Sequence, residues 1–488
     1  MRLRCIVAGV VFAVGILLLG LAPALAGVTE PAPRSDDAFD LMNLLARRGL
    51  HDLRNETWNL YGQLTWISSF KLPFRAPYTN LNGSPNSLSP EFEHSFTGTF
   101  TLYFGMALWK GAEIYFVPEM VSEQPLSRLA GLGGVIQNFE LQKQGSPVPT
   151  VYSSRIYLRQ TFNLGGDPVV RTSDPMQLGG TVSRRRLVFT LGNFSILDFF
   201  DKNSYAGDLR RQFFNMAFLS YAAYDFAADA RGYAWGAAAE LFWDDWAIRV
   251  ARMTPPQDPN QLPLDFRFWE FYGDQLEIEH VHEIRGRPGA VRILGYRNHE
   301  RMGRFDEAVA AFSADPSKNA ANCTEFNYGS PNATAPDLCW VRRPDVKMGI
   351  GLNLEQNVYR DIGVFFRGMY SDGRTEVYSF TSTDRSIAFG TLGRGSLWRR
   401  PRDYFGLGFA MGWISTSHAQ FLGMGGIDGF IGDGRINAAP ESVFEVFYGV
   451  NLYDSIWLSG DYQHITNPAY NADRGPVDIF GVRAHAEF

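Results

Sequence analysis

Large apolar side chains alternate with polar or small ones along most of this chain, with a period of two residues. One face of the segment 99–108 carries five large apolar side chains: Phe100, Leu102, Phe104, Met106 and Leu108. Threonine, tyrosine, glycine and alanine occupy the other face. Because successive side chains of a β-strand point to opposite faces, this alternation predicts a strand. A turn near 109–111 and a second alternating run to residue 119 complete a predicted hairpin.

The same period recurs to the end of the chain. About 16 such runs can be recognised, which fits the even strand numbers of single-chain bacterial barrels. The clearest lie at 155–163, 231–241, 245–252, 346–357, 362–371, 441–452 and 456–463. Each run has one apolar face and one polar face, and the polar faces of several runs carry Arg and Glu.

Two architectures produce this alternation: a soluble sandwich, whose apolar face packs on a second sheet, and a transmembrane barrel, whose apolar face meets lipid. Strand lengths near 10 residues suit a tilted crossing of a bilayer. The connections also alternate in length, with tight turns near 109–111, 358–361 and 453–455 and long polar stretches such as 80–94, 164–183 and 301–345. Short periplasmic turns and long outer loops are typical of outer-membrane barrels. We therefore predict an all-β fold, an antiparallel transmembrane barrel of about 16 strands with a wet interior.

Two stretches depart from the period of two. Residues 36–53 place apolar side chains at roughly helical spacing, which predicts a short helix on the periplasmic side of the barrel or inside it. Residues 212–228 are apolar without clean alternation, so they form either an ordinary strand or a constriction loop that folds inward.

The first 26 residues have two arginines, an apolar core and a terminal Ala-Leu-Ala, which predict a secretory signal peptide. A transmembrane anchor is the alternative. The predicted organisation is a signal peptide at 1–26, a helical periplasmic or lumenal segment at 27–57 and an outer-membrane porin barrel at 58–488.

Charge and cysteine content narrow the partners. Without residues 1–26, 43 Lys and Arg face 51 Asp and Glu, a balance that argues against nucleic acid. Two cysteines remain, Cys323 and Cys339, and in an exported chain we expect them to form a disulfide rather than a metal site. No cofactor is expected.

Eight segments resemble the bacterial carbohydrate-selective porins of the OprB type, in order along nearly the whole chain after the signal peptide. They are GQLTWIS (62–68), LWKGAEIYFVPE (108–119), RIYLRQTFNLGG (155–166), LGNFSILDFFDKNSY (191–205), YDFAADARGYAWG (224–236), GLNLEQNV (351–358), SDGRTEVYSFTSTDRSIAFG (371–390) and the segment 462–488. The resemblance implies a 16-stranded outer-membrane barrel for passive uptake of sugars, with arginines at its constriction. It does not identify the sugar.

Charged side chains on the polar faces are the candidates for a solute path. Alternation alone points eight of them inward: Arg155, Arg159, Arg249, Arg367, Glu113, Glu119, Glu355 and Glu445. A charge that faces lipid costs about 2–4 kcal/mol at the bilayer centre, which supports the inward assignment. Arginine offers five fixed donors to hydroxyl groups, and facing Arg and Glu create a transverse field. General arginine richness and solvated loops are the alternative explanation.

Other features are weaker candidates. SRRRL (183–187) suits a solvated rim or a contact with lipopolysaccharide phosphates, and the tryptophans near strand ends suit membrane anchoring. His280 and His282 share one side of a strand, which we interpret as a strand-end feature rather than a metal pair. No sequence motif of the common hydrolases or nucleotide enzymes is present.

The final segment, GVRAHAEF, alternates to its last residue. It predicts a closing strand with Val482, Ala484, Ala486 and Phe488 towards lipid, and Phe488 resembles the signal that the barrel-assembly machinery recognises. We expect an outer-membrane porin, not an enzyme, monomeric or homotrimeric, with sugars or small polar solutes, lipid and lipopolysaccharide as partners. A barrel-borne enzyme and a soluble exported sugar-binding protein are the alternatives.

Overall fold

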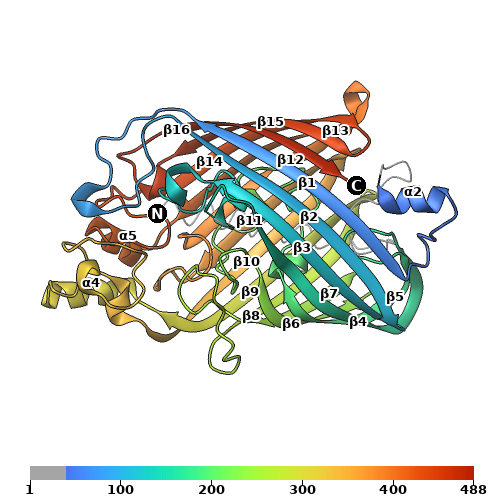
Figure 1. Ribbon diagram of the computed structural model, residues 1–488, viewed down its shortest axis with the longest axis horizontal. Helices are drawn as coiled ribbons and strands as arrows, with labels where there is room; N and C mark the ends of the chain where they lie inside the picture. The colour runs from blue at the N-terminus through green and yellow to red at the C-terminus, as the bar shows by residue number, and fades with distance from the viewer. Residues whose placement is uncertain (1–39, 144) are drawn as a thin grey trace.

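Sixteen antiparallel strands close into one barrel in the computed structural model, which describes residues 40–143 and 145–488 (Figure 1). Each strand pairs with its neighbours in sequence, and β1 pairs with β16 from Gln63 opposite Glu487 to Lys71 opposite Ile479. The predicted all-β barrel is therefore confirmed. The signal peptide predicted at 1–26 lies outside the described residues.

The strands range from 8 to 22 residues. Their bounds are β1 Trp58–Lys71, β2 Glu93–Trp109, β3 Ala112–Gln124, β4 Thr150–Arg171, β5 Gly180–Phe194, β6 Ala234–Trp243, β7 Trp246–Met253, β8 Tyr272–Ile284, β9 Arg287–Met302, β10 Arg343–Tyr359, β11 Ile362–Ser371, β12 Arg385–Gly395, β13 Arg400–Trp413, β14 Glu441–Tyr453, β15 Ile456–Thr466 and β16 Val477–Glu487. The helices are α2 Leu41–Arg47, α3 Met216–Leu219, α4 Phe305–Ala314 and α5 Thr416–Gly423.

The two faces of each strand differ in the way that the alternation predicts. On β2, Phe104 and Met106 are 40% and 50% exposed, whereas Thr99 and Thr101 on the other face are fully buried. A water-soluble fold buries its large apolar side chains, so exposed rows of them around a barrel indicate a lipid-facing surface. In the described part of the chain, no helix has both the length and the apolar character needed to cross a membrane.

The connections at one end of the barrel are short and those at the other end are long. The short ones are 110–111, 172–179, 244–245, 285–286, 360–361, 396–399 and 454–455. The expected long connection at 164–183 was wrong: β4 and β5 extend through most of it, because Val169 and Val170 continue to pair with Val182 and Thr181. We call the two ends the short-turn end and the long-loop end, and assign them to the periplasm and the exterior.

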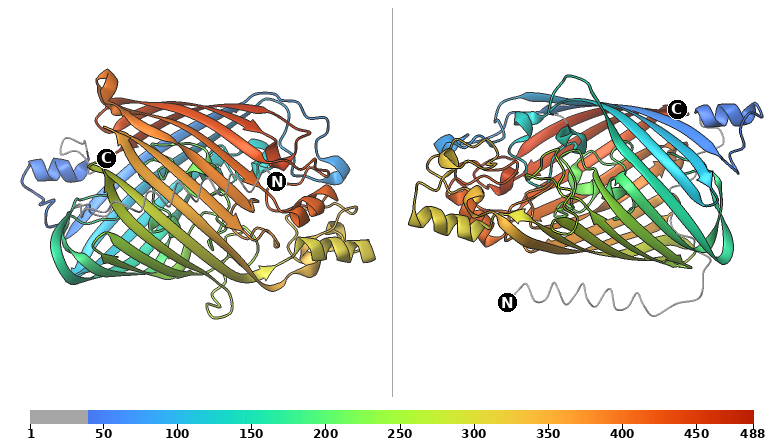
Figure 2. Two further views of the ribbon diagram at one scale, coloured as in Figure 1. Left: turned by 180° about the vertical axis from the view of Figure 1, so that it is seen from behind. Right: turned by 60° about the horizontal axis from the view of Figure 1, so that its bottom comes forward.

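Helix α2 lies at the short-turn end, on the opposite side of the barrel from α4 and α5 (Figures 1 and 2). Asp40 caps its first turn, since the Asp40 carboxylate accepts the backbone N–H of Asn43 at 2.8 Å. Met42 is fully buried and packs with Tyr61, Tyr103 and Val117, which lie on the inner faces of β1 to β3. Of the helix predicted over 36–53, the described residues 40–53 contain α2 at Leu41–Arg47, which packs at the short-turn end, and residues 36–39 lie outside the described residues.

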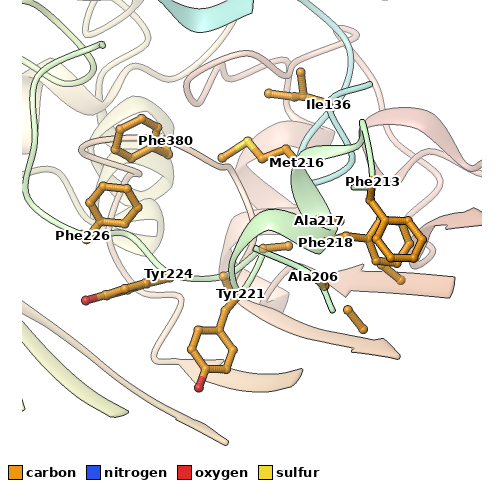
Figure 3. Packing of buried hydrophobic residues seen from close by; sticks show 14 of the residues in the cluster. Ile136, Ala206, Phe213, Met216, Ala217, Phe218, Tyr221, Tyr224, Phe226 and Phe380 are labelled. Carbon is orange, nitrogen blue, oxygen red and sulfur yellow. The ribbon is translucent and has the colours of Figure 1, made fainter. Parts of the chain in front are cut away.

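The interior of the barrel is occupied by chain rather than empty. Two long connections, 125–149 and 195–233, fold inward and bury a large apolar cluster against the inner wall (Figure 3). Phe213 and Phe218 from the second connection contact Phe365 and Phe447 on the wall. Residues 212–228 therefore form an inward-folded loop around the single turn α3, and the alternative of an ordinary strand is wrong.

The remaining long connections cap the long-loop end. Helices α4 and α5 pack on each other there, with Phe305 and Phe421 fully buried between them (Figure 2). Cys323 and Cys339, 16 residues apart in the connection 303–342, are joined in a disulfide with 6.6 Å between their Cα atoms.

Candidate functional site

The structure places all eight candidate Arg and Glu side chains on the inner face of the barrel. They come from six strands: Glu113 and Glu119 on β3, Arg155 and Arg159 on β4, Arg249 on β7, Glu355 on β10, Arg367 on β11 and Glu445 on β14. They do not form one ring. Their partners divide them into side chains that hold the inward loop, a wall network and a partly exposed cluster.

Arg367 fixes the inward loop 195–233 to the wall. Its guanidinium donates to the Asp201 carboxylate at 3.0 Å and to the backbone carbonyls of Ala206 and Phe218 at 2.6 and 2.8 Å. The Arg367 side chain is 1% exposed. Because each of its three nitrogen atoms donates to an acceptor of the loop, this buried arginine acts as a structural clamp.

Two wall glutamates hold the same loop through its backbone. Glu355 accepts the N–H of Ser204 at 2.6 Å, and Glu445 accepts the N–H groups of Phe214 and Asn215 at 2.6 and 3.0 Å. A buried backbone N–H without a partner is costly, so a carboxylate on the wall specifies where the loop runs. Glu355 and Glu445 are therefore loop anchors.

Arg249 belongs to a buried network within the wall. Its guanidinium pairs with Glu240 at 3.0 Å, Glu277 at 2.9 Å and Glu279 at 3.3 Å. Arg292 on β9 continues the network by pairing with Glu279 at 2.5 Å. Inside a low-dielectric barrel these charges compensate one another, because removing one would leave its partners buried and unpaired.

Arg155, Arg159, Arg171 and Arg210 form a cluster that retains some exposure, and we call it the arginine cluster. Each of the four side chains is 12–14% exposed. Arg155 forms a bidentate pair with Asp198 at 2.6 and 2.7 Å, and Arg159 lies 3.8 Å from Glu113, which also pairs with Arg171. Burial favours the neutral form of Asp198, but Arg155 outweighs it and lowers the pKa of Asp198.

Arg210 reaches the cluster from the inward loop. It pairs with Glu140 at 2.8 Å and with Glu119 at 3.3 Å, and Lys143 also pairs with Glu119, at 2.6 Å. Burial disfavours the charged ammonium of Lys143, but Glu119 overcomes this effect and raises its pKa. The cationic and acidic side chains of this part of the interior thus come from wall strands and from both inward connections.

Sequence reasoning missed several members of these groups. Lys143 and Arg210 lie in the inward connections, where no period of two exists to assign a direction. Arg292 and Arg171 lie within strands, and strand parity at β9 and at the extended end of β4 is the signal that would have identified them. Tyr115 and Tyr157, whose rings lie 5.1 and 5.5 Å from the Arg159 guanidinium, share the inner face of their strands with it.

The three arginines of SRRRL lie at the short-turn end, where β5 begins. Arg184 pairs with Asp245 at 2.6 Å, and Arg185 pairs with Asp244 at 2.7 Å. The suggested contact with lipopolysaccharide phosphates stays a prediction, and the position of this segment at the short-turn end argues against it. The alternative of a solvated rim fits the partly exposed pairs.

The possible metal ligands are engaged in other contacts. Within the described residues, the grouping of His, Cys, Asp or Glu ligand atoms is Cys323, Asp337 and Cys339, and its two sulfur atoms are bonded to each other. At the end of β8, His280 stacks on Trp246 at 4.4 Å and His282 hydrogen-bonds with Gln356 at 3.1 Å. Both histidines fit the strand-end interpretation.

A buried histidine joins two connections at the long-loop end. His418 on α5 lies between Asp384 and Asp428, with nitrogen–oxygen distances of 3.2 and 3.3 Å. Burial disfavours a charged imidazole, but Asp384 and Asp428 outweigh that cost and raise the pKa of His418 to about 9. Asp384 is its ionised partner, since its pKa is lowered, whereas burial raises the pKa of Asp428 despite the same imidazole. The arrangement ties residues 372–384 to 414–440.

This geometry predicts that the long-loop end loosens in alkaline solution. The pKa of His418 is higher in the folded state than its ordinary 6.5, so its contribution, on the order of 3 kcal/mol, is complete below pH 6.5 and is lost as the pH rises through about 9. We expect amide exchange in residues 372–384 and 414–440 to accelerate between pH 8 and about 10, beyond the intrinsic base-catalysed increase. In His418→Gln the exchange should be fast already at pH 7, and equal protection of both proteins at pH 7 would exclude this role.

Comparison with known proteins bears on the family and the fold of this chain. The family of carbohydrate-selective porins of the OprB type matches residues 88–488. Among solved structures, OprB of Pseudomonas putida is similar with a TM-score of 0.62 and 14% identity, over 88% of this chain and 94% of that chain. The DcaP channel of Acinetobacter baumannii gives a TM-score of 0.46 and 9% identity, over 88% and 97% of the two chains. The search of curated proteins found no match.

The structural likeness to the Pseudomonas putida porin, at its low identity, supports the fold. The closed barrel excludes the alternative of a soluble sandwich. The family match extends over most of the chain and supplies the function. This chain belongs to the OprB family of carbohydrate-selective porins and is an outer-membrane channel for sugars and other small solutes.

Proposed function

We propose that solutes cross this channel by passive diffusion, and that the arginine cluster makes the selective contacts. One observation carries the proposal. Arg155, Arg159, Arg171 and Arg210 keep 12–14% of their side chains exposed inside the barrel, whereas Arg249 and Arg367 keep 4% and 1%. Only the first four can exchange a water molecule for a solute hydroxyl. The proposal requires no cofactor, energy source or catalytic step.

The chemistry around Arg159 suits a sugar. A guanidinium donates in a fixed plane to vicinal hydroxyls, and the buried rings of Tyr115 and Tyr157 support the guanidinium of Arg159. Arg159 donates to the Met176 carbonyl at 3.0 Å and lies over the rings of Tyr115 and Tyr157, so its position is set before a solute arrives. Pre-organised donors reduce the cost of replacing hydration water.

The acidic partners limit the charge preference of the channel. Glu113, Glu119 and Asp198 lie beside the four arginines and compensate much of their charge. A row of cations that faces carboxylates creates a field across the path, which orients polar solutes without strongly concentrating anions. This arrangement favours neutral sugars and polyols over inorganic ions.

The test is liposome swelling with a series of sugars and size-matched polyols. We expect Arg155→Ala/Arg159→Ala to permit swelling but to change the relative rates within the series by about tenfold, which corresponds to the loss of one hydrogen bond to a charged donor, about 1.5 kcal/mol. Arg159→Lys keeps the positive charge but loses the planar set of guanidinium donors, so it should show part of the change in relative swelling rates. Arg301→Ala, an exposed arginine at the long-loop end, serves as the control.

Two outcomes would contradict the proposal in different ways. Unchanged relative rates in the double variant would remove Arg155 and Arg159 from the selective path. Absence of swelling with the wild-type protein would reject passive diffusion itself.

The same proposal includes export and assembly. We infer that residues 1–26 direct secretion, that the barrel is inserted by the barrel-assembly machinery through its closing strand, and that lipid and lipopolysaccharide surround the apolar outer face. The fully inserted unit is a monomer or a homotrimer. The exposed apolar rows on β2, β8 and β16 support a lipid environment.

A further inference from the structure

A polar cavity lies at the long-loop end, outside the arginine cluster. It has a volume of about 230 Å³ and forms where five connections meet: 72–92, 125–149, 254–271, 303–342 and 414–440. These connections leave the barrel from different sides, so the cavity lies over the mouth of the channel. Pockets for drug-sized ligands measure about 300–1,000 Å³, so this cavity has room for one sugar ring rather than a longer saccharide.

The cavity contains polar groups that lack protein partners. The Oδ1 atom of Asn260 is buried and accepts no hydrogen bond. The Asn260 backbone is fixed, since its N–H donates to the Tyr378 carbonyl at 2.6 Å. Among the described residues, none forms an ion pair or hydrogen bond with the guanidinium of Arg128. The Asn260 oxygen has no surface that a ligand could reach, so the exposed guanidinium of Arg128 is the polar group that the cavity offers, and it suits a ligand with an acidic group.

Aromatic rings form another side of the cavity. Phe326 and Tyr328 pack edge to face with their ring centroids 5.0 Å apart, and Phe430 also lines the cavity. The Tyr328 hydroxyl donates to the Glu376 carboxylate at 3.0 Å, which holds this ring in place. Flat apolar surfaces beside hydrogen-bonding groups are the combination that a pyranose ring requires, because the sugar has apolar faces and a polar rim.

The charge of the cavity favours anionic sugars over neutral ones. Arg128 is the cationic lining residue, and no lining residue is acidic. In the arginine cluster, by contrast, each arginine lies close to a carboxylate. An unpaired guanidinium beside neutral amides favours an anionic ligand.

We propose that this cavity is an entry site for a single sugar ring that bears a carboxylate, such as a hexuronate. The aromatic rings would hold the apolar face and Arg128 would pair with the carboxylate. The site is distinct from the arginine cluster, and it rests on the proposed channel function only for its role in uptake. Binding in the cavity precedes the constriction and raises the local concentration of acidic sugars at the mouth.

The test is isothermal titration calorimetry on the full-length refolded barrel with D-glucuronate, D-glucose and acetate. We expect glucuronate to bind about fivefold more tightly than glucose, as a partly exposed ion pair would produce. Arg128→Gln should abolish that preference and leave glucose binding unchanged, and Phe326→Ala should weaken both sugars. Arg374→Gln and Phe266→Ala, exposed residues of other surfaces, should match the wild type.

Each alternative result contradicts a defined part of the inference. Equal affinity for glucose and glucuronate would reject the acidic preference, and unchanged binding in Phe326→Ala would place the sugar elsewhere. Acetate binding as tight as that of glucuronate would indicate a simple anion site. Liposome swelling separates the two proposals: swelling without sugar binding overturns the entry site alone, and absence of swelling overturns the channel function.

Discussion

Replacing Arg367 with methionine is expected to release the inward loop and widen the channel. The Arg367 side chain is buried and donates to Asp201 and to the backbone carbonyls of Ala206 and Phe218. Methionine has a similar length but no donor, so the substitution removes the cationic partner of the buried Asp201 carboxylate and the donors to the backbone carbonyls of Asp201, Ala206 and Phe218. Breaking one side of a buried ion pair costs about 3–5 kcal/mol. Local opening costs less than global unfolding, so this loss acts first on residues 201–218, which the Arg367 donors hold.

The measurement is single-channel conductance in planar bilayers, together with limited proteolysis. We expect a severalfold higher conductance in Arg367→Met and new cleavage sites within residues 195–233, while the strands remain protected. Arg301→Met is the matched control, because Arg301 is exposed and pairs at 3.4 Å with Glu325 in a neighbouring connection. Wild-type conductance together with an intact loop in Arg367→Met would show that the apolar cluster around Phe213 and Phe218 holds the loop without the clamp.

Replacing Phe488 with alanine is expected to impair barrel assembly more than it impairs the assembled pore. The backbone of Phe488 exchanges two hydrogen bonds with Gly62, at 2.7 and 2.9 Å, and so extends the seam between β16 and β1. Its ring lies on the outer face, against the space that a side chain at residue 62 would occupy, and stacks on Phe100 with 6.0 Å between centroids. Alanine keeps the two backbone hydrogen bonds but removes the ring that covers Gly62.

Comparing assembly in cells with folding into detergent separates the packing of the Phe488 ring from its recognition by the assembly machinery. We expect the fraction of heat-modifiable, compact barrel in cells to fall by more than half for Phe488→Ala, with the conductance of the inserted fraction unchanged. Loss of one partly buried Phe ring costs about 1–3 kcal/mol, so folding into detergent should fall less. Phe488→Tyr keeps an aromatic ring and should restore assembly. An equal loss in cells and in detergent would assign the effect to packing at Gly62 rather than to the assembly machinery.

The sequence predicts which side chains of the barrel wall point inward, but not how those side chains are paired inside the barrel. Alternation correctly assigned Glu113, Arg159, Arg367 and Glu445 to the inner face, because strand geometry alone determines which side a residue occupies. It did not separate Arg159, which remains partly exposed, from Arg367, which is clamped by loop carbonyls. Both are arginines at equivalent parity, and their difference depends on residues about 150 positions away.

The conformation of the loops depends even more on contacts with residues that are distant in the sequence. Residues 212–228 are apolar because they pack against Phe365 and Phe447 inside the barrel, and a local sequence pattern cannot distinguish that environment from lipid. The expected loop at 164–183 became strand because β4 and β5 pair beyond the usual length. Pairing between strands depends on the partner strand, which local propensity does not include.

The sequence by itself determined the barrel, its approximate strand number, the outward and inward faces and the closing strand, because a period of two residues acts locally and repeats through every strand. Only the tertiary structure decided which inner charges are paired, which stay exposed and where two long connections fold. Those properties arise from contacts between distant segments, such as Arg210 with Glu119 or Arg128 beside Phe326, and no short stretch of sequence contains both partners.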